Sequence, residues 1–374
     1  MPITLHTLRR YAIARSLFKP TTLGRAIKKL GFVQADPIRA PARAQDLTLR
    51  HRVEGYCAGD LERRYPQLDV EEDFFINYGF VPRALHELMH PRLPQTPWTA
   101  ARAKQAEAVL AFIRERGVVH PREVDAHFAH GKATNWFGGS SNASTQLLDA
   151  MHYRGLLRVA RRVGGTRVYT ARETPVSHAT GIATPAATTA QRHAAVDALA
   201  DVAIRKYAPL PAPCLGFVVG LLRYAVPQWA ADRAAALARA KQRLSSTRIE
   251  GVEWYWPAGE HPQSARGRVD DAVRLLTPFD PIVWDRRRFE RFWGWPYRFE
   301  AYTPAAQRKR GYYALPLLWR SRVIGWGNVA AEGGGLNAKF GYIGRAPRDV
   351  AFRTGLESEL ERLRAFLKKS DPPY

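Results

Sequence analysis

The stretch from Trp98 to Ala171 constrains the fold most, because its apolar residues change from helical to strand spacing within one short module. The predicted elements are, in order, helices over residues 103–116, 121–127 and 144–153 and strands over residues 156–160 and 166–169. Gly117 follows the first helix as a stop, and Gly164 and Gly165 lie between the two strands as in a hairpin turn. Three helices followed by a two-stranded wing is the order of a winged-helix domain, so we expect one here.

Two flanking regions follow the same plan less clearly, which favours tandem winged helices. The first spans residues 5–52. The other spans residues 191–256, and its expected elements are helices over 194–207 and 230–244 and a wing over 248–256. Three prolines within residues 91–97 and a Thr-, Ala- and Pro-rich stretch at 174–190 predict linkers between the modules.

The last hundred residues are richer in aromatic side chains and in strand-like alternation. Residues 311–318, 323–330 and 338–343 predict a meander with a glycine turn at 333–335, and a closing helix carries Leu356, Leu360, Leu363 and Leu367 on one face. The expected fold class is α+β: tandem winged-helix domains followed by a β-rich C-terminal domain. The expected domain boundaries are 1–95, 98–172, 190–260 and 270–374.

Charge indicates the kind of partner. The 374 residues hold 57 Lys and Arg against 34 Asp and Glu, a formal net charge of +23. The positive charge is uneven, since the stretch from Met1 to Ala35 contains no acidic residue. A polyanion is the expected partner, and duplex DNA is the polyanion we favour, although a generally basic, solvated surface is the alternative.

Several classes of protein are not indicated. No segment has the length and apolar character of a membrane helix, and no apolar signal-peptide core follows Met1, so we expect a cytoplasmic, nucleoid-associated protein. Cys57 and Cys214 are the two cysteines and show no metal-ligand spacing. We therefore expect no metal and no organic cofactor, and since nothing suggests a dimer seam we expect a monomer.

The segment from Gly31 to Ile38 carries the residues that we single out for chemistry. Pro37 biases Asp36 toward an extended conformation, and residues two apart in an extended chain share a face, so Gln34 and Asp36 point the same way. One carboxylate then lies beside one amide, near Arg39 and Arg43. We expect this positive charge to keep Asp36 ionised.

The same segment resembles a known family. Phe-Val-Gln-Ala-Asp-Pro-Ile at 32–38, followed by Ala-Arg-Ala-Gln-Asp-Leu-Thr-Leu-Arg at 42–50, is similar to the YcaQ/AlkZ family of winged-helix glycosylases that act on DNA interstrand crosslinks. Further matches lie at 278–288, 302–306 and 311–316. The resemblance implies that Gln34 and Asp36 are the catalytic pair of the Gln-x-Asp branch. Gln45 departs from the family pattern, because many members have His there.

A single carboxylate suffices for glycoside hydrolysis only when the leaving group needs no acid. A purine alkylated at N7 is already cationic and departs neutral, so Asp36 would activate water and stabilise the oxocarbenium-like sugar while Gln34 orients the water. The expected activity is hydrolysis of the N-glycosidic bond of N7-alkylated purines, with unhooking of interstrand crosslinks and without strand cleavage. The alternative is structural: Asp36 caps a turn and Gln34 is a surface residue.

Other basic residues are candidates for DNA contacts. Those we expect to bind the phosphate backbone or a groove are Arg39, Arg43, Lys132, Arg161, Arg162 and Arg167. For the wing arginines, a solvated surface is the alternative. Two other functions stay open: a winged-helix transcriptional regulator without catalysis, and an architectural or single-strand-binding protein.

Overall fold

A computed structural model describes residues 2–90, 92–93, 96–134, 140–172, 188–264, 269–332 and 335–368. The chain divides into two compact units. One comprises residues 1–61, 201–219 and 237–372, and the other comprises residues 62–200, 220–236 and 373–374. Helices and antiparallel sheets are mixed throughout, so the predicted α+β class is confirmed. No helix in the described ranges has the length and apolar character to cross a membrane.

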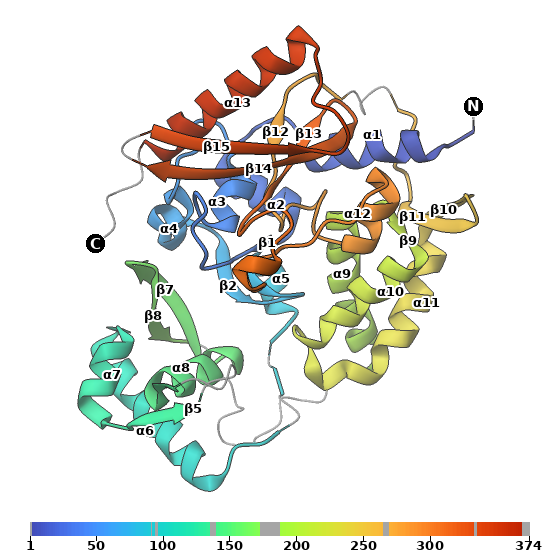
Figure 1. Cartoon of the computed structure of the whole chain (residues 1–374). Coiled ribbons are helices and arrows are strands. Elements are labelled where there is room, and N and C mark those ends of the chain that lie inside the picture. Colours follow the sequence, from blue (N-terminus) through green and yellow to red (C-terminus); the bar gives the residue numbers. More distant parts are fainter. Residues whose placement is uncertain are drawn as a thin grey trace. The chain divides into compact units, whose positions relative to one another are not determined.

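The first unit contains the predicted C-terminal meander. Its four strands follow the order β12-β13-β14-β15. They are β12 (Arg274–Leu275), β13 (Leu315–Trp319), β14 (Arg322–Glu332) and β15 (Gly335–Tyr342). The closing helix α13 (Val350–Leu367) lies across this sheet, as Figure 1 shows in red.

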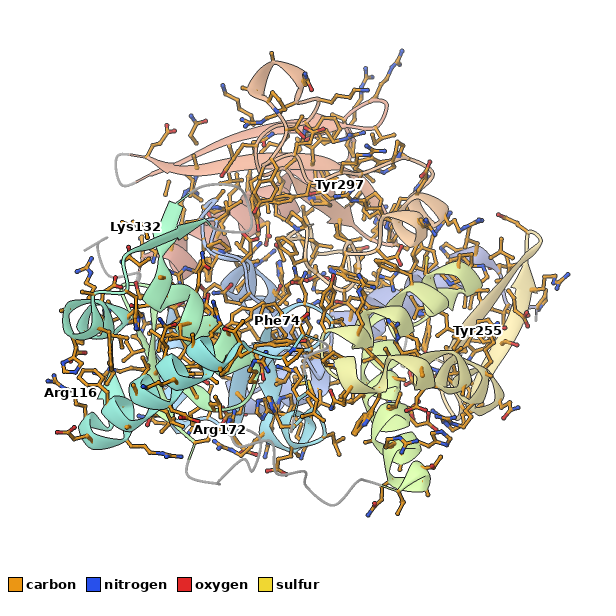
Figure 2. All side chains as sticks on the ribbon, turned by 90° about the horizontal axis from the view of Figure 1, so that it is seen from below. Phe74, Arg116, Lys132, Arg172, Tyr255 and Tyr297 are labelled. Carbon is orange, nitrogen blue, oxygen red and sulfur yellow. The ribbon has the colours of Figure 1, made fainter. Side chains whose placement is uncertain are left out.

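Two helices far apart in the sequence share one core in this unit. They are α1 (Leu5–Ser16), whose N-cap Thr4 forms a capping box, and α12 (Arg286–Trp293), whose N-cap is Asp285. Leu8 and Ile13 of α1 are buried in one cluster with Phe289 and Phe292 of α12. Tyr297, labelled in Figure 2, joins the same cluster and donates a hydrogen bond from Oη to the carbonyl of Ala314 (2.7 Å). The C-terminal aromatic residues of this cluster therefore build a core.

The middle winged helix belongs to the second unit. Its elements are α6 (Ala100–Arg116), β4 (Val118–Val119), α7 (Pro121–Phe128), α8 (Ala143–Tyr153), β7 (Leu157–Val163) and β8 (Thr166–Ala171). The short strands β5 (Lys132–Thr134) and β6 (Ser140–Asn142) pair with each other. The sheet order is β4-β8-β7, so β4 pairs with β8, the second strand of the wing. The three helices and the hairpin predicted between residues 103 and 169 are confirmed.

The same topology recurs later in the chain. The elements are α9 (Thr189–Tyr207), β9 (Leu210–Pro211), α10 (Ala212–Gly220), α11 (Arg233–Arg243), β10 (Leu244–Ile249) and β11 (Val252–Pro257). Here too the short strand β9 pairs with the second wing strand, in the order β10-β11-β9. The wing begins earlier than the predicted residues 248–256, and α10 was not predicted from the sequence.

The N-terminal region shows the same order of elements. These are α2 (Leu23–Leu30), β1 (Val33–Gln34), α3 (Ala44–Leu49), α4 (Asp60–Arg64), β2 (Val70–Phe74) and β3 (Tyr78–Pro82), followed by α5 (Arg83–Glu87). Short 3-10 helices are η1 (Tyr65–Gln67), η2 (Leu221–Arg223), η3 (Pro227–Asp232) and η5 (Ala305–Gln307). The helix–strand–helix–helix–hairpin order thus occurs three times, while the four domain boundaries stay a prediction.

The structure describes little of one expected linker, and it shows a buried residue in the other. Most of residues 174–190 lies outside the described residues, and α9 already begins at Thr189. Within 91–97, however, Arg92 is buried, and its Nε donates to the carbonyl of Ala225 (2.8 Å). This part of the expected linker is anchored in a core, because a buried guanidinium must find hydrogen-bond acceptors.

Candidate active site

The segment that carries Gln34 and Asp36 is fixed from behind. Helix α2 ends at Leu30, and its C-cap Gly31 has a φ of 69°. Gly31 approaches Val202 so closely that a Cβ there would lie 2.4 Å from Val202 Cγ1. Lys206 Nζ donates to the carbonyl of Phe32 (2.6 Å), and burial lowers the pKa of this lysine to about 7. Both contacts come from α9, so this helix sets the backbone position of β1.

Gln34 is 6 % exposed and has an aromatic partner. Its Oε1 accepts a hydrogen bond from Trp284 Nε1 (3.0 Å). The Trp284 ring stacks on Tyr207, with centroids 4.4 Å apart, and its other neighbour is Phe217 at 5.9 Å. Oε1 is thus engaged by Trp284. The amide nitrogen of Gln34 carries the N–H donors that can bind a water molecule or a sugar.

Asp36 is partly buried and forms a local turn. Its Oδ1 accepts from the backbone N–H of Ile38 (2.9 Å), and its own N–H donates to Gln45 Oε1 (3.2 Å). In the part of the chain that the structure describes, no hydrogen bond from a protein donor reaches Oδ2 of Asp36. The structural alternative is thus partly realised, since Oδ1 supports a turn, while the second oxygen is available to a ligand.

The electrostatic environment of Asp36 differs from the expectation. Burial raises the pKa of this carboxyl group, and the hydrogen bond from Ile38 opposes that change only in part. The positive charge of Arg43 acts instead on the carboxylate of Asp46. Within the described residues no arginine is among the causes of this change, so the expected influence of Arg39 and Arg43 on the pKa of Asp36 is not observed, while the ionised state of Asp36 stays a prediction. A carboxylate with a raised pKa is a better proton acceptor than an exposed one.

Aromatic residues also lie on the side of Asp36. The negative charge of Asp36 contributes, after burial, to the raised pKa values of Tyr302 and Tyr313. Phe299 contacts both rings edge to face, with centroid distances of 5.9 Å to Tyr302 and 5.1 Å to Tyr313. The amide of the Gln-x-Asp pair therefore contacts Trp284, while the charge of its carboxylate acts on the pKa of two tyrosines.

The segment at 278–288 acts as an anchor for Trp284. Asp280 Oδ2 lies 2.9 Å from Arg52 Nη2, and both side chains are completely buried. Arg52 also donates to the carbonyls of Ser16 (2.8 Å) and Thr48 (2.6 Å). The ion pair between Arg52 and Asp280 links the N-terminal helices to the loop that contains Trp284, the partner of Gln34. The sequence motif alone did not predict this link.

The candidate DNA-binding residues fall into two groups. Arg39, Lys132 and Arg161 are exposed, and Lys132 on β5, labelled in Figure 2, donates to Asn142 Oδ1 (2.6 Å). Arg43 is almost entirely buried. Arg162 pairs with the buried Glu72, and Arg167 pairs with Asp149 (2.9 Å). These two wing arginines already have carboxylate partners, so their role at DNA stays a prediction.

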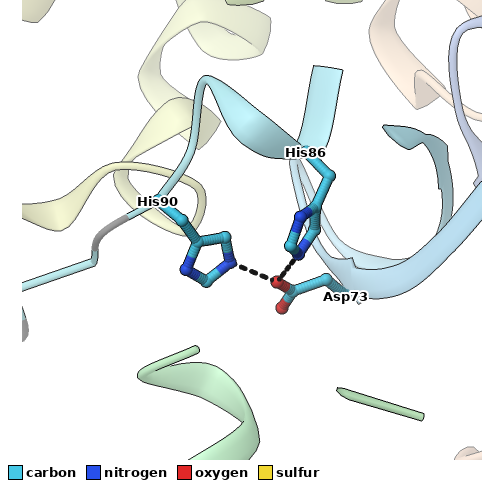
Figure 3. Close-up of side chains that lie close together, drawn as sticks. All are labelled: Asp73, His86 and His90. Carbon is cyan, nitrogen blue, oxygen red and sulfur yellow. Dashed lines mark hydrogen bonds and ion pairs between the residues drawn. The ribbon is translucent and has the colours of Figure 1, made fainter. Parts of the chain in front are cut away.

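A second cluster of titratable groups lies in the other unit, where three consecutive acids of β2 are buried. Figure 3 shows Asp73 between two histidines: its Oδ2 accepts from His86 Nε2 (2.9 Å) and His90 Nε2 (2.8 Å). Arg92 Nη1 lies 3.1 Å from the other oxygen. Burial alone would raise the pKa of Asp73, but Arg92 and the two imidazoles hold it well below its ordinary value. Sequence reasoning missed this cluster, for which the four-residue spacing of the histidines is a local signal.

The cluster has the donor set of a metal site, since two imidazoles and a carboxylate can ligate zinc or iron. Its charges argue otherwise. Arg172 Nη2 lies 3.1 Å from His86 Nε2, and Arg92 pairs with both oxygens of Asp73. A divalent ion would stand beside two guanidinium groups, so we interpret the cluster as a buried ion pair with neutral histidines.

This cluster predicts a pH dependence of stability. Burial lowers the pKa of His86 and of His90 to about 4, against 6.5 when unfolded. The unfolded chain therefore binds more protons between these values, and the stabilisation present above pH 6.5 is lost as the pH falls toward 4, by up to roughly 3 kcal/mol per histidine. Urea unfolding at pH 7.0 and 5.0 measures the loss. His86→Gln/His90→Gln should show a smaller difference between the two pH values; an unchanged difference would contradict the assignment.

Two comparisons show which known proteins this chain resembles. A model of the family described as DNA glycosylase AlkZ-like matches residues 27–366. The fold is also similar to that of the DNA glycosylase AlkZ of Streptomyces sahachiroi, with a TM-score of 0.60 over 98 % of this chain and 97 % of that one. Sequence identity in that comparison is 14 %, so it speaks for the fold alone.

Proposed function

The chain belongs to the AlkZ-like DNA glycosylase family, and we propose that it hydrolyses the N-glycosidic bond of N7-alkylated purines in duplex DNA and unhooks interstrand crosslinks formed through such bases. A DNA glycosylase acts on DNA, so DNA as substrate follows from the family. The adduct, the crosslink and the monomeric state are part of the proposal.

One observation carries the proposal: Asp36 keeps one oxygen for a ligand, and within the described residues no second acid contributes to its pKa. Burial and the Ile38 N–H are the two influences on its pKa in the described ranges. Ordinary glycoside hydrolysis needs a second carboxyl group to protonate the leaving group. A site with a single carboxylate therefore suits a base that leaves without protonation, and a purine alkylated at N7 is such a base.

The proposed reaction uses Gln34 and Asp36 as follows. The C1′–N9 bond breaks and its electron pair moves into the ring, which cancels the charge at N7, so the base leaves neutral. Asp36 stabilises the oxocarbenium-like sugar by its negative charge and accepts a proton from the attacking water, while the amide nitrogen of Gln34 holds that water. The products are the free base and an abasic site.

We also propose that the enzyme is monofunctional. A glycosylase that cleaves the strand needs an amine nucleophile. Lys206 is the amine placed behind β1, and its Nζ is buried against the Phe32 carbonyl. We propose phosphate contacts for the exposed candidates Arg39, Lys132 and Arg161. Arg43 is almost entirely buried and would have to become exposed to bind a phosphate, and Arg162 and Arg167 would have to exchange their carboxylate partners for DNA.

The deciding experiment measures free base released from duplex DNA. We expect release of 7-methylguanine, no release of guanine, and strands that stay intact until heated with alkali. A duplex carrying an interstrand crosslink between two N7 positions should become separable on denaturing gels. Tight binding without release of any cationic adduct would instead support the transcriptional regulator, and strand cleavage without alkali would contradict the monofunctional assignment.

A further inference from the structure

An exposed phenylalanine contacts the tryptophan that binds the proposed catalytic amide. Phe217, on α10, is 50 % exposed. Its ring centroid lies 5.9 Å from that of Trp284, and Trp284 Nε1 donates to Gln34 Oε1 (3.0 Å). All three residues belong to the same unit. A single exposed apolar side chain is common on a protein surface, so its neighbours decide what Phe217 can bind.

Buried side chains hold the Phe217 ring in place. Trp284, which contacts it, stacks on the fully buried Tyr207 with centroids 4.4 Å apart. One turn before Phe217 on the same helix, the buried Cys214 donates from Sγ to Asp285 Oδ1 (3.2 Å). Helix α10 and the segment around Trp284 are therefore joined by a ring contact and by a hydrogen bond.

Two unpaired arginines follow in that segment. Arg286 and Arg287 come directly after Asp285, and both are exposed in the first turn of α12. Within the described residues neither guanidinium group forms an ion pair or a hydrogen bond. Positive side chains at the start of a helix oppose its dipole, so they do not serve the stability of α12. Their free positive charge suits a phosphate.

We propose that Phe217 inserts beside the attacked nucleotide and takes the place of a stacked neighbouring base, while Arg286 and Arg287 bind phosphates of the same duplex. The inference rests on the proposed function and deepens it, because it names residues that open the base stack on the Gln34 side of the site. Gln34 and Asp36 act on the glycosidic bond, and Phe217 acts on the DNA around it.

The reaction requires such a contact. An enzyme that acts on one nucleotide of a duplex must loosen the stack around it. Apolar side chains inserted between bases replace part of the lost stacking, and arginines on neighbouring phosphates fix the position of the duplex. A crosslinked base is tied to the opposite strand and cannot leave the stack completely, so local unstacking by a side chain suits this substrate.

The first test measures unstacking directly. The probe is a duplex with one 2′-fluoro-7-methyl-2′-deoxyguanosine, in which the fluorine blocks cleavage, and with 2-aminopurine as its neighbour on the 5′ side or, in a second duplex, on the 3′ side. We expect wild-type protein to raise the 2-aminopurine fluorescence in one of the two duplexes, and Phe217→Ala to lose that rise. Phe217→Ala should also bind the probe about tenfold more weakly, because one base–aromatic contact is lost.

Matched variants make this test specific. Phe217→Tyr should keep the fluorescence rise and the affinity, since the ring remains. Ile343→Ala removes an apolar side chain of the same unit that is 45 % exposed, and it should behave as the wild type. Undamaged duplex should bind Phe217→Ala and wild-type protein with affinities within about threefold of each other, because its bases stay stacked.

The arginines are tested by the salt dependence of binding. Each phosphate contact contributes about 0.9 to the slope of log affinity against log salt concentration, so Arg286→Gln and Arg287→Gln should each lower the slope by roughly that amount. Arg353→Gln removes the same charge from an exposed position of α13 and should leave the slope unchanged. Slopes equal to that of the wild type in Arg286→Gln and Arg287→Gln would overturn the phosphate contacts.

Single-turnover release of 7-methylguanine separates failure of this inference from failure of the proposed function. If wild-type protein releases the base but Phe217→Ala matches it in fluorescence rise and affinity, the role of Phe217 is overturned and the glycosylase proposal stands. A variant that loses only the release rate would show that the ring acts through Trp284, which also overturns the inference. If the wild type releases no base, the proposed function fails; a fluorescence rise that depends on Phe217 still supports the inference, and its absence overturns it.

Discussion

Asp36→Asn is expected to lower the single-turnover rate of base release by about 10²- to 10⁴-fold, the usual contribution of one acid–base or electrostatic group. The substitution preserves the side-chain size, and its Oδ1 can still accept from the N–H of Ile38 as in the wild type (2.9 Å). What it removes is the negative charge that stabilises the sugar cation and the oxygen that accepts the proton. Rapid-quench measurement of 7-methylguanine release from duplex DNA gives the rate.

Two further readouts separate catalysis from a structural role of Asp36. Burial raises the pKa of Asp36, so the wild-type rate should fall as the pH drops through that raised value, and Asp36→Asn should lose this acid limb. In Asp36→Asn the affinity for DNA should hold or rise slightly, because a negative charge near the phosphates is gone.

Gln34→Ala should lower the rate of base release less than Asp36→Asn does, if Gln34 only orients water. If Asp36→Asn lowers the melting temperature but leaves the rate per bound complex unchanged, Asp36 is a turn cap and not a catalytic residue.

The local elements were predictable because they depend on periodicity and on turn residues. The helix over residues 103–116 and the glycine turn at Gly164 and Gly165 were identified from side chains close together in the sequence, and both are present. Helix α10 was missed for a related reason. Its Ala-Pro-Cys-Leu-Gly-Phe-Val-Val-Gly sequence is apolar on all sides, so it has no helical stripe for a pattern to detect.

The burial of charged residues was not predictable in this way. Strand β2 contains Glu71, Glu72 and Asp73, which in isolation indicate a solvated strand, yet all three are buried. Some of their partners come from distant parts of the chain; Arg162, for example, is 90 residues away from Glu72. A wing arginine placed at DNA by sequence reasoning is therefore paired within the protein, since a buried carboxylate needs a cation.

The candidate site shows the same division. The Gln-x-Asp spacing and its extended backbone could be proposed from Pro37 and from the family resemblance. The hydrogen bond between Trp284 and Gln34 joins residues 250 positions apart, and neither residue signals it locally. The raised pKa of Asp36 was unforeseen because it depends on how much water the folded chain removes, which charge counts along the sequence do not measure.

Arg52→Met should destabilise the protein by about 3 to 5 kcal/mol, because it leaves the carboxylate of Asp280 buried without its cation. Both members of the pair are fully buried, at a distance of 2.9 Å. The substitution also removes the donors to the carbonyls of Ser16 and Thr48. Urea or guanidinium unfolding, followed by tryptophan fluorescence, measures the change in the free energy of unfolding.

A double-mutant cycle and a surface control make this prediction specific. Asp280→Asn should cost less in the Arg52→Met background than in the wild type, because the uncompensated charge has then gone; its Oδ1 can still accept from Ile282 N–H (3.0 Å). Arg243→Met breaks a pair of similar length with Asp201 (2.9 Å), but its members are 37 % and 33 % exposed. That change should lower the free energy of unfolding by less than about 1 kcal/mol, since exposed pairs contribute little.

Equal losses of stability in Arg52→Met and Arg243→Met would show that Arg52 does not hold the Trp284 segment. With the predicted difference, Arg52→Met should also slow base release, because Trp284 would no longer be fixed against Gln34.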